Sequence, residues 1–540
     1  MFHEIRRRSS KVGSLSLASA FHYLSTLSSA HLNALINDRV RIGSLDDAQK
    51  LFDENPQSRN VASWNCMLNG YTRHGRIRCA IRMFDEMTER DVVSWNTMLA
   101  GFRWAGDPER AIQHFFQMER LGFGSTEFTL TTVVSAASET GFSALVPQLH
   151  GRAVHLAFQS NAFVGTALIG GYANLGDCTA VRQAFNEIIL KNIASWNALI
   201  SAYMGLGFIG EARAAFEMMP EQNIVSWTSL VNGYICNKML DEASHCFDRM
   251  PEKNVVSWTA MISGYEQSGL FIQSIEFFHL MRNSGIQPNE ATLSTVLSAC
   301  AGCSSLLFGR QIHAFILKLG IPLDVILLSS LVNMYAKCGD MDAAAQIFNT
   351  MRIKNLISWN SIIGGYARHG LPLQALDEFK RMNRDCTMPD HITFVSVLSA
   401  CAHGGLVEEG ERYFELMERE FSIKAGLKHY TCMVDLYGRA GLLNKAEKFI
   451  QVMPFEPDVV MWGALLAACG MHSSLELGSR AAECIYSLEK DHPAIYLLLS
   501  KLHGDKGAWN QAIELREMMR ETGAKKQKGT SWIESSSVLA

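Results

Sequence analysis

The stretch that decides the fold runs from residue 255 to residue 289 and reads VVSWTAMISGYEQSGLFIQSIEFFHLMRNSGIQPN. Gly269 divides it into two halves, and Gly285 supplies a stop at its end. The second half, residues 271–278, carries its own apolar face. The first half repeats apolar residues at i, i+3, i+4 and i+7, the spacing of one helix face: Trp258, Met261, Ile262 and Tyr265. The stretch therefore predicts a helical hairpin.

The same pattern returns along the chain. A Ser-Trp pair followed by Asn or Thr occurs at Trp64, Trp95, Trp196, Trp227, Trp258 and Trp359. Successive gaps are 31, 101, 31, 31 and 101 residues, and 101 residues hold two units of 35 and one of 31. A single hairpin of this size cannot bury both of its apolar faces, so neighbouring hairpins must stack. The spacing predicts an all-α fold, a right-handed superhelical α-solenoid of stacked helical hairpins.

Composition narrows the function classes. The 540 residues are 48% hydrophobic, which excludes a disordered chain or a disulfide-rich miniature. A net charge of −4 argues against an indiscriminate basic coat for nucleic acid. No apolar run reaches the roughly 18 residues of a membrane span. Cys300 and Cys303 form the only CxxC in the sequence. Because no second pair of ligands follows, buried packing thiols are favoured over a zinc site. We expect no metal or cofactor.

The first 28 residues differ from the rest. They contain Arg6, Arg7, Arg8 and Lys11 among many serines, and Glu4 is their only acid. This composition is typical of an organelle transit peptide and lacks the long apolar centre of a secretory signal. A disordered basic tail is the alternative. The arginine-rich start favours the mitochondrion, with the chloroplast as the alternative.

The units resemble pentatricopeptide repeats, specifically the plant subclass that mixes short, standard and long repeats. About thirteen repeats of 31–36 residues fill residues 29–458, and the runs HITFVSVLSACAHGGLVEEG (391–410) and HYTCMVDLYGRAGLL (429–443) look like the subclass's last long and short repeats. Residues 459–534, from VVMWGALLAAC to GTSWIE, are similar to its E-type extension motifs, and residues 535–540 form a tail. Tetratricopeptide repeats, which usually bind peptides, lack this alternation of lengths.

Two positions of the short and standard repeats carry polar residues. The first position directly follows the tryptophan or its equivalent: Asn65, Asn96, Thr166, Asn197, Thr228, Thr259, Ser329, Asn360 and Thr431. The second position ends the repeat: Asp91, Thr126, Asn192, Asn223, Asn254, Asn289, Asn355, Asp390 and Asp458. Helix capping alone would explain much of the second position. It does not explain Asn or Thr inside a helix, where propensity favours neither residue.

The family resemblance implies that these two positions read one RNA base per repeat. Its pairing rules give the sequence UCnAYAAnAUnG, in which n marks the bases opposite the long repeats. The pairs of the long repeats include Thr131 with Asn161 and Ser294 with Asp324. Val395 in the last long repeat has no side-chain hydrogen-bonding group. Three residues before the first position the chain is apolar, and in the family such residues sandwich the base. They are Val93, Val225, Val256, Ile326 and Ile357, with Ala62 and Ala194. Ordinary interhelical packing is the alternative.

No catalytic motif stands in the chain. It contains no HxE paired with CxxC, as a cytidine deaminase needs, and no phosphate loop or HExxH, so we expect no catalytic residue. Glu534 is followed by only six residues. By resemblance, the extension motifs recruit a DYW-type cytidine deaminase in trans, and the protein selects organellar transcript sites for C-to-U editing.

Other functions and partners stay open at this point. A factor for RNA processing, splicing or stability would share the repeats, and a protein-binding scaffold would show varied charges instead of alternating Asn and Thr. The partners expected are single-stranded organellar RNA and editing factors, with neither a membrane nor DNA. Lys525, Lys526 and Lys528 could contact phosphate or could be a solvated charge run.

Overall fold

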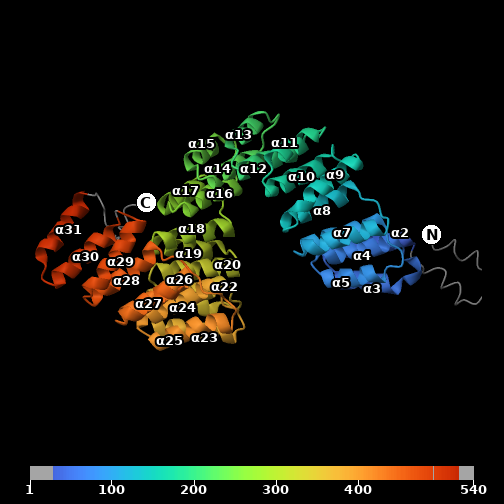
Figure 1. The fold of residues 1–540 in the computed structure, drawn as a ribbon. Helices are drawn as coiled ribbons and strands as arrows, with labels where there is room; N and C mark the ends of the chain where they lie inside the picture. Colours follow the sequence, from blue (N-terminus) through green and yellow to red (C-terminus); the bar gives the residue numbers. More distant parts are fainter. Residues whose placement is uncertain (1–27, 491, 522–540) are drawn as a thin grey trace, which may run out of the picture. The chain divides into compact units, whose positions relative to one another are not determined.

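The structure, a computed structural model, describes residues 28–490 and 492–521. In this part of the chain every regular element is a helix, which confirms the predicted all-α fold (Figure 1). The predicted transit peptide apart from Ser28, the cluster Lys525, Lys526 and Lys528, and the tail at 535–540 lie outside the described residues. Among the described helices, none is both long and apolar enough to cross a bilayer.

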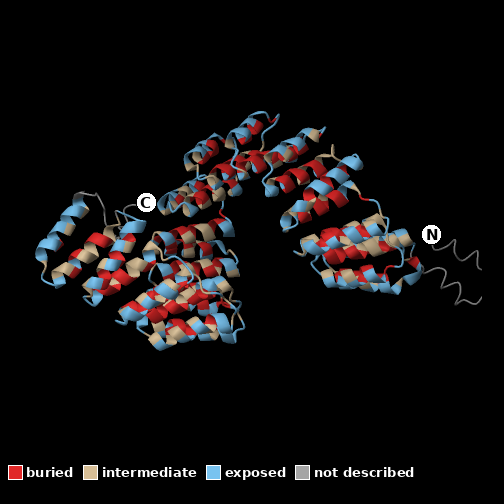
Figure 2. Cartoon of the chain, viewed as in Figure 1, coloured by how far each residue is buried: buried red, intermediate tan, exposed pale blue. Residues whose placement is uncertain are grey.

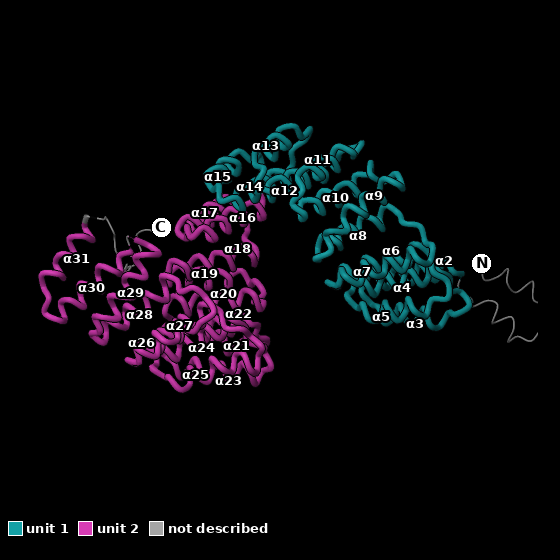
Figure 3. Tube along the Cα trace, in the orientation of Figure 1, with its two compact units in different colours: residues 1–253 teal, residues 254–540 magenta. Residues whose placement is uncertain are grey.

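The chain divides into two compact units, residues 1–253 and residues 254–540 (Figure 3). Each repeat contributes a first helix and a second helix. In unit 1 the first helices are α2 (Ser29–Ile42), α4 (Val61–Arg73), α6 (Val92–Trp104), α8 (Glu127–Glu139), α10 (Ala162–Leu175), α12 (Ile193–Gly205) and α14 (Ile224–Cys236). The second helices are α3 (Leu45–Glu54), α5 (Ile77–Glu86), α7 (Pro108–Arg120), α9 (Val146–His155), α11 (Cys178–Glu187), α13 (Ile209–Glu217) and α15 (Leu240–Arg249), with short 3-10 helices η2 (Pro56–Ser58) and η3 (Ser143–Leu145).

Unit 2 repeats this plan and adds two hairpins after residue 458. Its first helices are α16 (Val255–Gln267), α18 (Glu290–Gly302), α20 (Val325–Lys337), α22 (Leu356–Arg368), α24 (His391–Gly404), α26 (Leu427–Arg439), α28 (Val459–Met471) and α30 (Pro493–Asp505). Its second helices are α17 (Phe271–Asn283), α19 (Leu306–Leu319), α21 (Met341–Thr350), α23 (Pro372–Arg384), α25 (Val407–Arg419), α27 (Leu443–Val452), α29 (Leu475–Leu488) and α31 (Trp509–Glu521). Within each unit, every first helix packs on the next first helix and on its own second helix.

Burial follows from this stacking. A first helix has neighbours on several sides, whereas a second helix faces solvent along much of its length. Figure 2 accordingly shows buried residues concentrated on the first helices, and more exposed residues on the second helices.

The Ser of the recurring Ser-Trp pair closes a capping box in four of the six copies, at Ser63, Ser94, Ser226 and Ser257. In α6 the backbone N–H of Ser94 donates to Asp91 Oδ1 at 2.8 Å, and the backbone N–H of Asp91 donates to Ser94 Oγ at 2.8 Å. The same two-way bond occurs between Asn223 and Ser226 at the start of α14. The box satisfies backbone N–H groups that the first turn of a helix leaves without partners, and it fixes where each first helix begins.

The Trp joins consecutive hairpins. Trp95 contacts the ring of Phe84 on the preceding second helix, with ring centroids 4.9 Å apart and an edge-to-face angle. Trp359 contacts Phe348 at 4.8 Å in the same way. Both tryptophans are buried, and rings in this arrangement attract each other beyond the effect of burial alone.

Glycines that precede an aromatic residue on the first helices allow close helix packing. A Cβ on Gly233 in α14 would lie 2.3 Å from Met204 Cγ on α12, and a Cβ on Gly365 in α22 would lie 2.9 Å from Ala336 Cβ on α20. Both distances are too short for a real Cβ. Neighbouring first helices therefore need glycine at these contacts.

Candidate nucleic-acid interface

The two polar positions fall at fixed places on the first helices. We call the residue five positions after each N-cap the reading residue. The last residue of each repeat is also the N-cap of the next first helix, and we call it the closing residue. The reading residue lies in the second turn of one first helix, and its partner caps the first helix of the next repeat. Every reading residue is half-buried except Thr228 and Ser329, which are buried.

Four of the predicted pairs are in direct contact. Asn65 Nδ2 donates to Asp91 Oδ1 at 3.1 Å, and Asn360 Nδ2 donates to Asp390 Oδ1 at 3.0 Å. The other two contacts follow the same path between neighbouring first helices: Asn96 Nδ2 to Thr126 Oγ1 at 3.2 Å, and Ser329 Oγ to Asn355 Oδ1 at 3.0 Å.

The remaining reading residues bond elsewhere. Thr166 and Thr431 donate to backbone carbonyls of their own helices, Ala162 and Leu427. Thr259 shares a hydrogen bond of 2.6 Å with Thr292, which in turn donates to Asn289, so that pair is joined through a third residue. Thr228 donates to Ile224 within its own helix. Asn197 Oδ1 is buried and has no hydrogen-bond partner within the described part of the chain.

The capping interpretation of the closing residues is confirmed. All nine closing residues are N-caps whose side chains accept from the backbone at the third residue of the next helix: Asp91, Thr126, Asn192, Asn223, Asn254, Asn289, Asn355, Asp390 and Asp458. In the asparagines the cap uses only Oδ1 as an acceptor. The amide Nδ2 donors are not needed for capping, so they stay available for another hydrogen bond.

The two aspartates with Asn partners are acceptors. Partial burial alone would raise the pKa of Asp91, but hydrogen bonds from Ser94 and Asn65 outweigh it and the pKa is lowered. The pKa of Asp390 is lowered in the same way, by Thr393 and Asn360 against the effect of burial. Both side chains are therefore ionised near neutral pH and can only accept hydrogen bonds.

The apolar residues two positions after each N-cap, which we call the stacking residues, are exposed. Val93, Val225 and Val256 keep 57–59% of their surface exposed, and Ile326 and Ile357 keep 63%. The alternative of ordinary interhelical packing is therefore wrong for these residues. Ala62 and Ala194 occupy the same position and are also exposed.

Four further apolar residues at this position are exposed and were not predicted from the sequence. Phe128 and Phe163 are 53% and 70% exposed, and Ile392 and Val460 are 61% and 67% exposed. Their common signal was present in the sequence, because each stands two residues after a capping residue, as Val93 does. Only Phe128 and Ile392 start long repeats, so the apolar position does not depend on repeat length.

A groove runs beside these residues in unit 1. It has a volume of about 660 Å³ and is lined mainly by α8, α10 and α12. Phe163, Thr166 and Asn192 stand on its wall, whereas its lining also includes small residues such as Gly170 and Ala198. The groove thus brings a stacking residue, its reading residue and the closing residue of the same repeat to one concave surface.

Basic residues stand at the other ends of some first helices in both units, and in unit 1 they are Arg41 of α2 and Arg73 of α4, both exposed. Thirteen residues after the N-cap, four successive first helices of unit 2 carry a basic residue, and all four are exposed: Lys337, Arg368, His403 and Arg439. The same position in α6, α8, α10, α12 and α14 holds Trp104, Glu139, Asn174, Gly205 and Cys236. Exposed Lys and Arg side chains arranged at the spacing of neighbouring helices can neutralise successive phosphates of an extended strand.

Comparison with protein families agrees with this architecture. The "PPR repeat family" model matches residues 59–92, 253–302 and 354–403, and the "PPR repeat" model matches residues 93–123, 194–224, 225–255, 392–420 and 428–455. A "Pentatricopeptide repeat domain" model matches residues 316–369. An "E motif" model matches residues 472–534, so this match begins just after α28 and not at residue 459, where the extension was predicted to begin.

Known proteins resemble the chain over most of its length. Two mitochondrial pentatricopeptide repeat-containing proteins of Arabidopsis thaliana are 33% and 35% identical over 93% and 94% of this chain, and over 63% and 65% of their own lengths. A chloroplastic one is 35% identical over 76% of this chain and 48% of its own length. The chain thus spans less than two thirds of these relatives.

A solved structure shares the fold. The pentatricopeptide repeat protein PPR10, crystallised with an 18-nucleotide psaJ RNA element, aligns with a TM-score of 0.56 at 17% identity, covering 93% of this chain and 80% of that one. Together with the stacked hairpins and the matched repeats, these likenesses establish that the chain belongs to the pentatricopeptide repeat family.

Proposed function

We propose that this protein is a sequence-specific single-stranded RNA-binding adaptor that selects organellar transcript sites for C-to-U editing by a DYW-type deaminase acting in trans. The observation that carries the proposal is the register of three side chains. Reading, closing and stacking residues recur at the same places on successive first helices, as one base per repeat requires.

The stacking residues supply a surface for the face of a base. These aliphatic and aromatic side chains keep more than half of their surface exposed, and exposed apolar surface favours a flat apolar ligand. A nucleobase is such a ligand, and stacking contributes about 1–3 kcal/mol per base on aromatic side chains.

The reading and closing residues supply hydrogen bonds to the base edge. A hydroxyl and an amide offer both donors and acceptors, and the pairs of Thr or Ser with Asn are assigned to adenine. The ionised carboxylates of Asp91 and Asp390 accept only, and their pairs with Asn65 and Asn360 are assigned to uracil, whose ring N–H is a donor.

Three comparisons support the proposal. PPR10 was crystallised in complex with an RNA element. The match to an E motif favours editing over processing, splicing or RNA stability, for which the repeats alone would suffice. Relatives named as mitochondrial and as chloroplastic support an organelle, and the arginine-rich beginning of the chain favours the mitochondrion.

The test is a binding titration of the purified protein against RNA of the sequence UCnAYAAnAUnG and against a control in which every adenine is replaced by guanine. We expect the control to bind at least about tenfold more weakly, because each mispaired polar contact weakens binding by roughly 1–3 kcal/mol. Equal affinity for the two RNAs would refute base reading. Loss of conversion at one cytidine downstream of a matching transcript site, in plants lacking the protein, would separate editing from RNA stability.

A further inference from the structure

A buried hydroxyl stands at the third residue of nine first helices in the described part of the chain. Six of these residues are serines and three are threonines, and none has any exposed surface: Ser63, Ser94, Thr129, Ser195, Ser226, Ser257, Thr292, Ser358 and Thr393. A buried hydroxyl needs an acceptor for its proton. Which acceptor it uses differs between the two residue types.

The threonines bond to the reading residue of the preceding repeat. Thr129 Oγ1 donates to Asn96 Oδ1 at 2.7 Å, and Thr393 Oγ1 donates to Asn360 Oδ1 at 2.6 Å. Thr292 bonds at 2.6 Å to the hydroxyl of the reading residue before it. Each of these bonds joins two neighbouring first helices. The amide oxygen of both asparagines therefore has a partner inside the protein.

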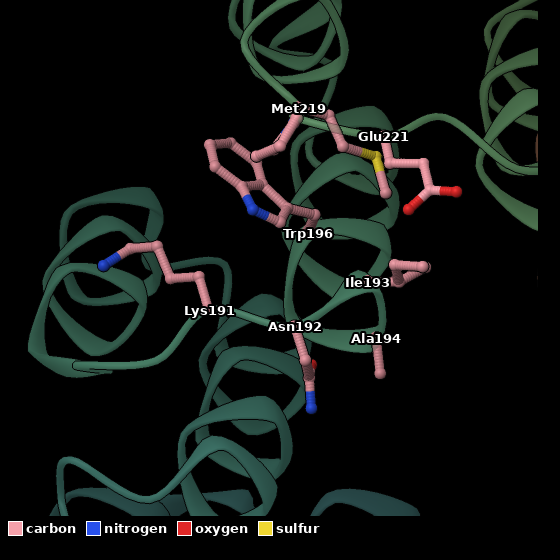
Figure 4. A pocket seen from close by; sticks show the side chains of 8 residues that line it. Lys191, Asn192, Ile193, Ala194, Trp196, Met219 and Glu221 are labelled. Atoms are coloured by element: carbon pink, nitrogen blue, oxygen red, sulfur yellow. The ribbon is translucent and has the colours of Figure 1, made fainter.

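Most of the serines bond instead to the closing residue. Ser94 Oγ donates to the backbone carbonyl of Asp91 at 2.8 Å, and the serines at the starts of α12, α14, α16 and α22 make the same bond at 2.8–3.0 Å. Figure 4 shows the start of α12, where Asn192 is the closing residue. Ser63 differs, because it donates to Asn33 Oδ1 of α2 at 2.6 Å. Threonine lacks the rotational freedom of serine, because its Cβ is branched.

The reading asparagines show the consequence. Asn65 and Asn197 precede first helices whose third residue is a serine bonded to the closing residue, and the Oδ1 atom of each is buried with no hydrogen-bond partner within the described part of the chain. A buried oxygen without a partner destabilises the orientation that leaves it so. Asn96 and Asn360 precede helices whose third residue is threonine, and their oxygens are bonded.

Asn65 and Asn360 are a matched pair for this comparison. Both donate through Nδ2 to an aspartate, at 3.1 and 3.0 Å, and both are assigned to uracil. Turning the amide of Asn360 would break two hydrogen bonds, to Thr393 and to Asp390. Turning the amide of Asn65 would break only the bond to Asp91, and it would release the oxygen from a place where it has no partner. The amide of Asn360 is therefore held more firmly.

We infer that the third residue of each first helix is a positioning residue for base recognition, because it sets how firmly the amide of the preceding reading asparagine is held. The inference rests on the proposed base reading. A held amide offers its N–H donor, which matches the carbonyl O4 of uracil. Cytosine has an amino group at the same place, and an amide that can turn accepts from it. Uracil should thus be distinguished from cytosine more sharply opposite Asn360 than opposite Asn65.

Binding of the full-length protein to three RNAs tests the inference. One RNA has the sequence UCnAYAAnAUnG, and the other two carry cytosine in place of its first or its tenth base, with the same bases at n and Y in all three. We expect a preference for uracil of about tenfold at the tenth base, opposite Asn360, and of about threefold at the first base, opposite Asn65, a difference that one hydrogen bond accounts for.

Three variants change the third residue. Thr393→Val removes the hydroxyl and keeps the branched side chain, so the preference at the tenth base should fall to about threefold. Ser94→Thr should raise the preference at the first base to about tenfold. Ser94→Val is the matched control, since it also removes a hydroxyl from a capping box but breaks no bond to a reading residue. It should leave the preference at the first base unchanged, and thermal melting of each variant measures the loss of capping separately.

Three results would overturn the inference. An unchanged preference at the tenth base in Thr393→Val would show that this threonine only caps its helix, while base reading itself would stand. An equal loss of preference in Thr393→Val and Ser94→Val, each at its own base, would assign the effect to the capping box. Equal binding of the unaltered protein to all three RNAs would refute base reading, and the inference with it.

Discussion

Residues 92–192 in unit 1 and residues 255–355 in unit 2 are two versions of one design. Both contain repeats of 35, 35 and 31 residues, and Trp95 corresponds to Trp258 and Asn192 to Asn355. In both segments every first helix begins after a polar capping residue, and Trp95 and Trp258 are buried, whereas exposed residues at corresponding places differ. Stacked hairpins therefore constrain the helix starts and the interior, and they leave the exposed side chains open to change. We call two residues at corresponding places of the two segments sister residues. Exchanging sister residues between the segments shows what each difference does.

The largest effect is expected at His114, whose sister is Phe277. The ring of His114 lies 4.5 Å from Trp95 and 5.3 Å from Phe102, and burial lowers its pKa to about 4. An unfolded histidine has a pKa near 6.5, so the unfolded state gains a proton first as the pH falls, and stability is lost between about pH 6.5 and pH 4. We expect about 2 kcal/mol of local destabilisation at pH 5 and none of this loss in His114→Phe.

Hydrogen exchange of the α6 and α7 amides at pH 7 and pH 5 measures this local destabilisation. Phe277 packs 4.8 Å from Tyr265 in the sister cluster, so the variant residue is known to fit this environment. An unchanged acid response in His114→Phe would assign the destabilisation to other groups.

Base preference is the next largest effect. Thr166 with Asn192 and Ser329 with Asn355 are both assigned to adenine, at the fourth and ninth bases of the site. Thr166→Asn and Ser329→Asn reproduce the Asn–Asn pair of residues 197 and 223, and each should shift preference at its own base toward a pyrimidine by about ten- to hundredfold. Binding to RNAs that differ only at those bases measures the shift. A uniform loss of affinity without a change of preference would mean that the position supports the helix and does not read.

Stacking should differ between Phe163 and its sister Ile326. Phe163→Ile removes a ring from the wall of the groove, and Ile326→Phe adds one at the corresponding place in unit 2. We expect about fivefold weaker binding for the first and tighter binding for the second, because a base stacks better on a ring than on an aliphatic side chain. Fluorescence anisotropy with the full RNA site measures both. The two variants must change the RNA affinity in opposite directions. Weaker binding by both variants would indicate disturbed packing.

The smallest effect concerns Asn174 and its sister Lys337 at the ends of α10 and α20. Lys337→Asn should reduce the slope of log affinity against log salt by about 0.7, the value for one phosphate contact of a single strand, and Asn174→Lys should increase it by the same amount. At fixed salt each change alters affinity only about two- to threefold. Titrations at several salt concentrations measure the slope. An unchanged slope would place the phosphates away from this end of the helices.

Much of the interface could be predicted because a repeat gives the same position many times. The choice of Asn, Thr or Ser at the reading position is visible once the units are aligned on their tryptophans. The chain alone could not show that Val93 and Ile357 are exposed, since an apolar residue in an amphipathic helix ordinarily packs inside. Phe128 and Phe163 were missed for a similar reason, because large rings suggest a core until the helix around them is packed.

The sequence by itself determined the class of fold, the two lengths of unit and the place of each helix start, because these follow from local periodicity, glycine stops and capping residues. Only the tertiary structure decided which apolar residues stay in contact with water and which polar pairs touch. Asn65 and Asp91 stand 26 residues apart, and they meet because two first helices pack side by side with a hydrogen bond of 3.1 Å. Contacts of this kind depend on the distance between stacked helices. Small residues at the helix interface set this distance, and no single repeat contains both helices.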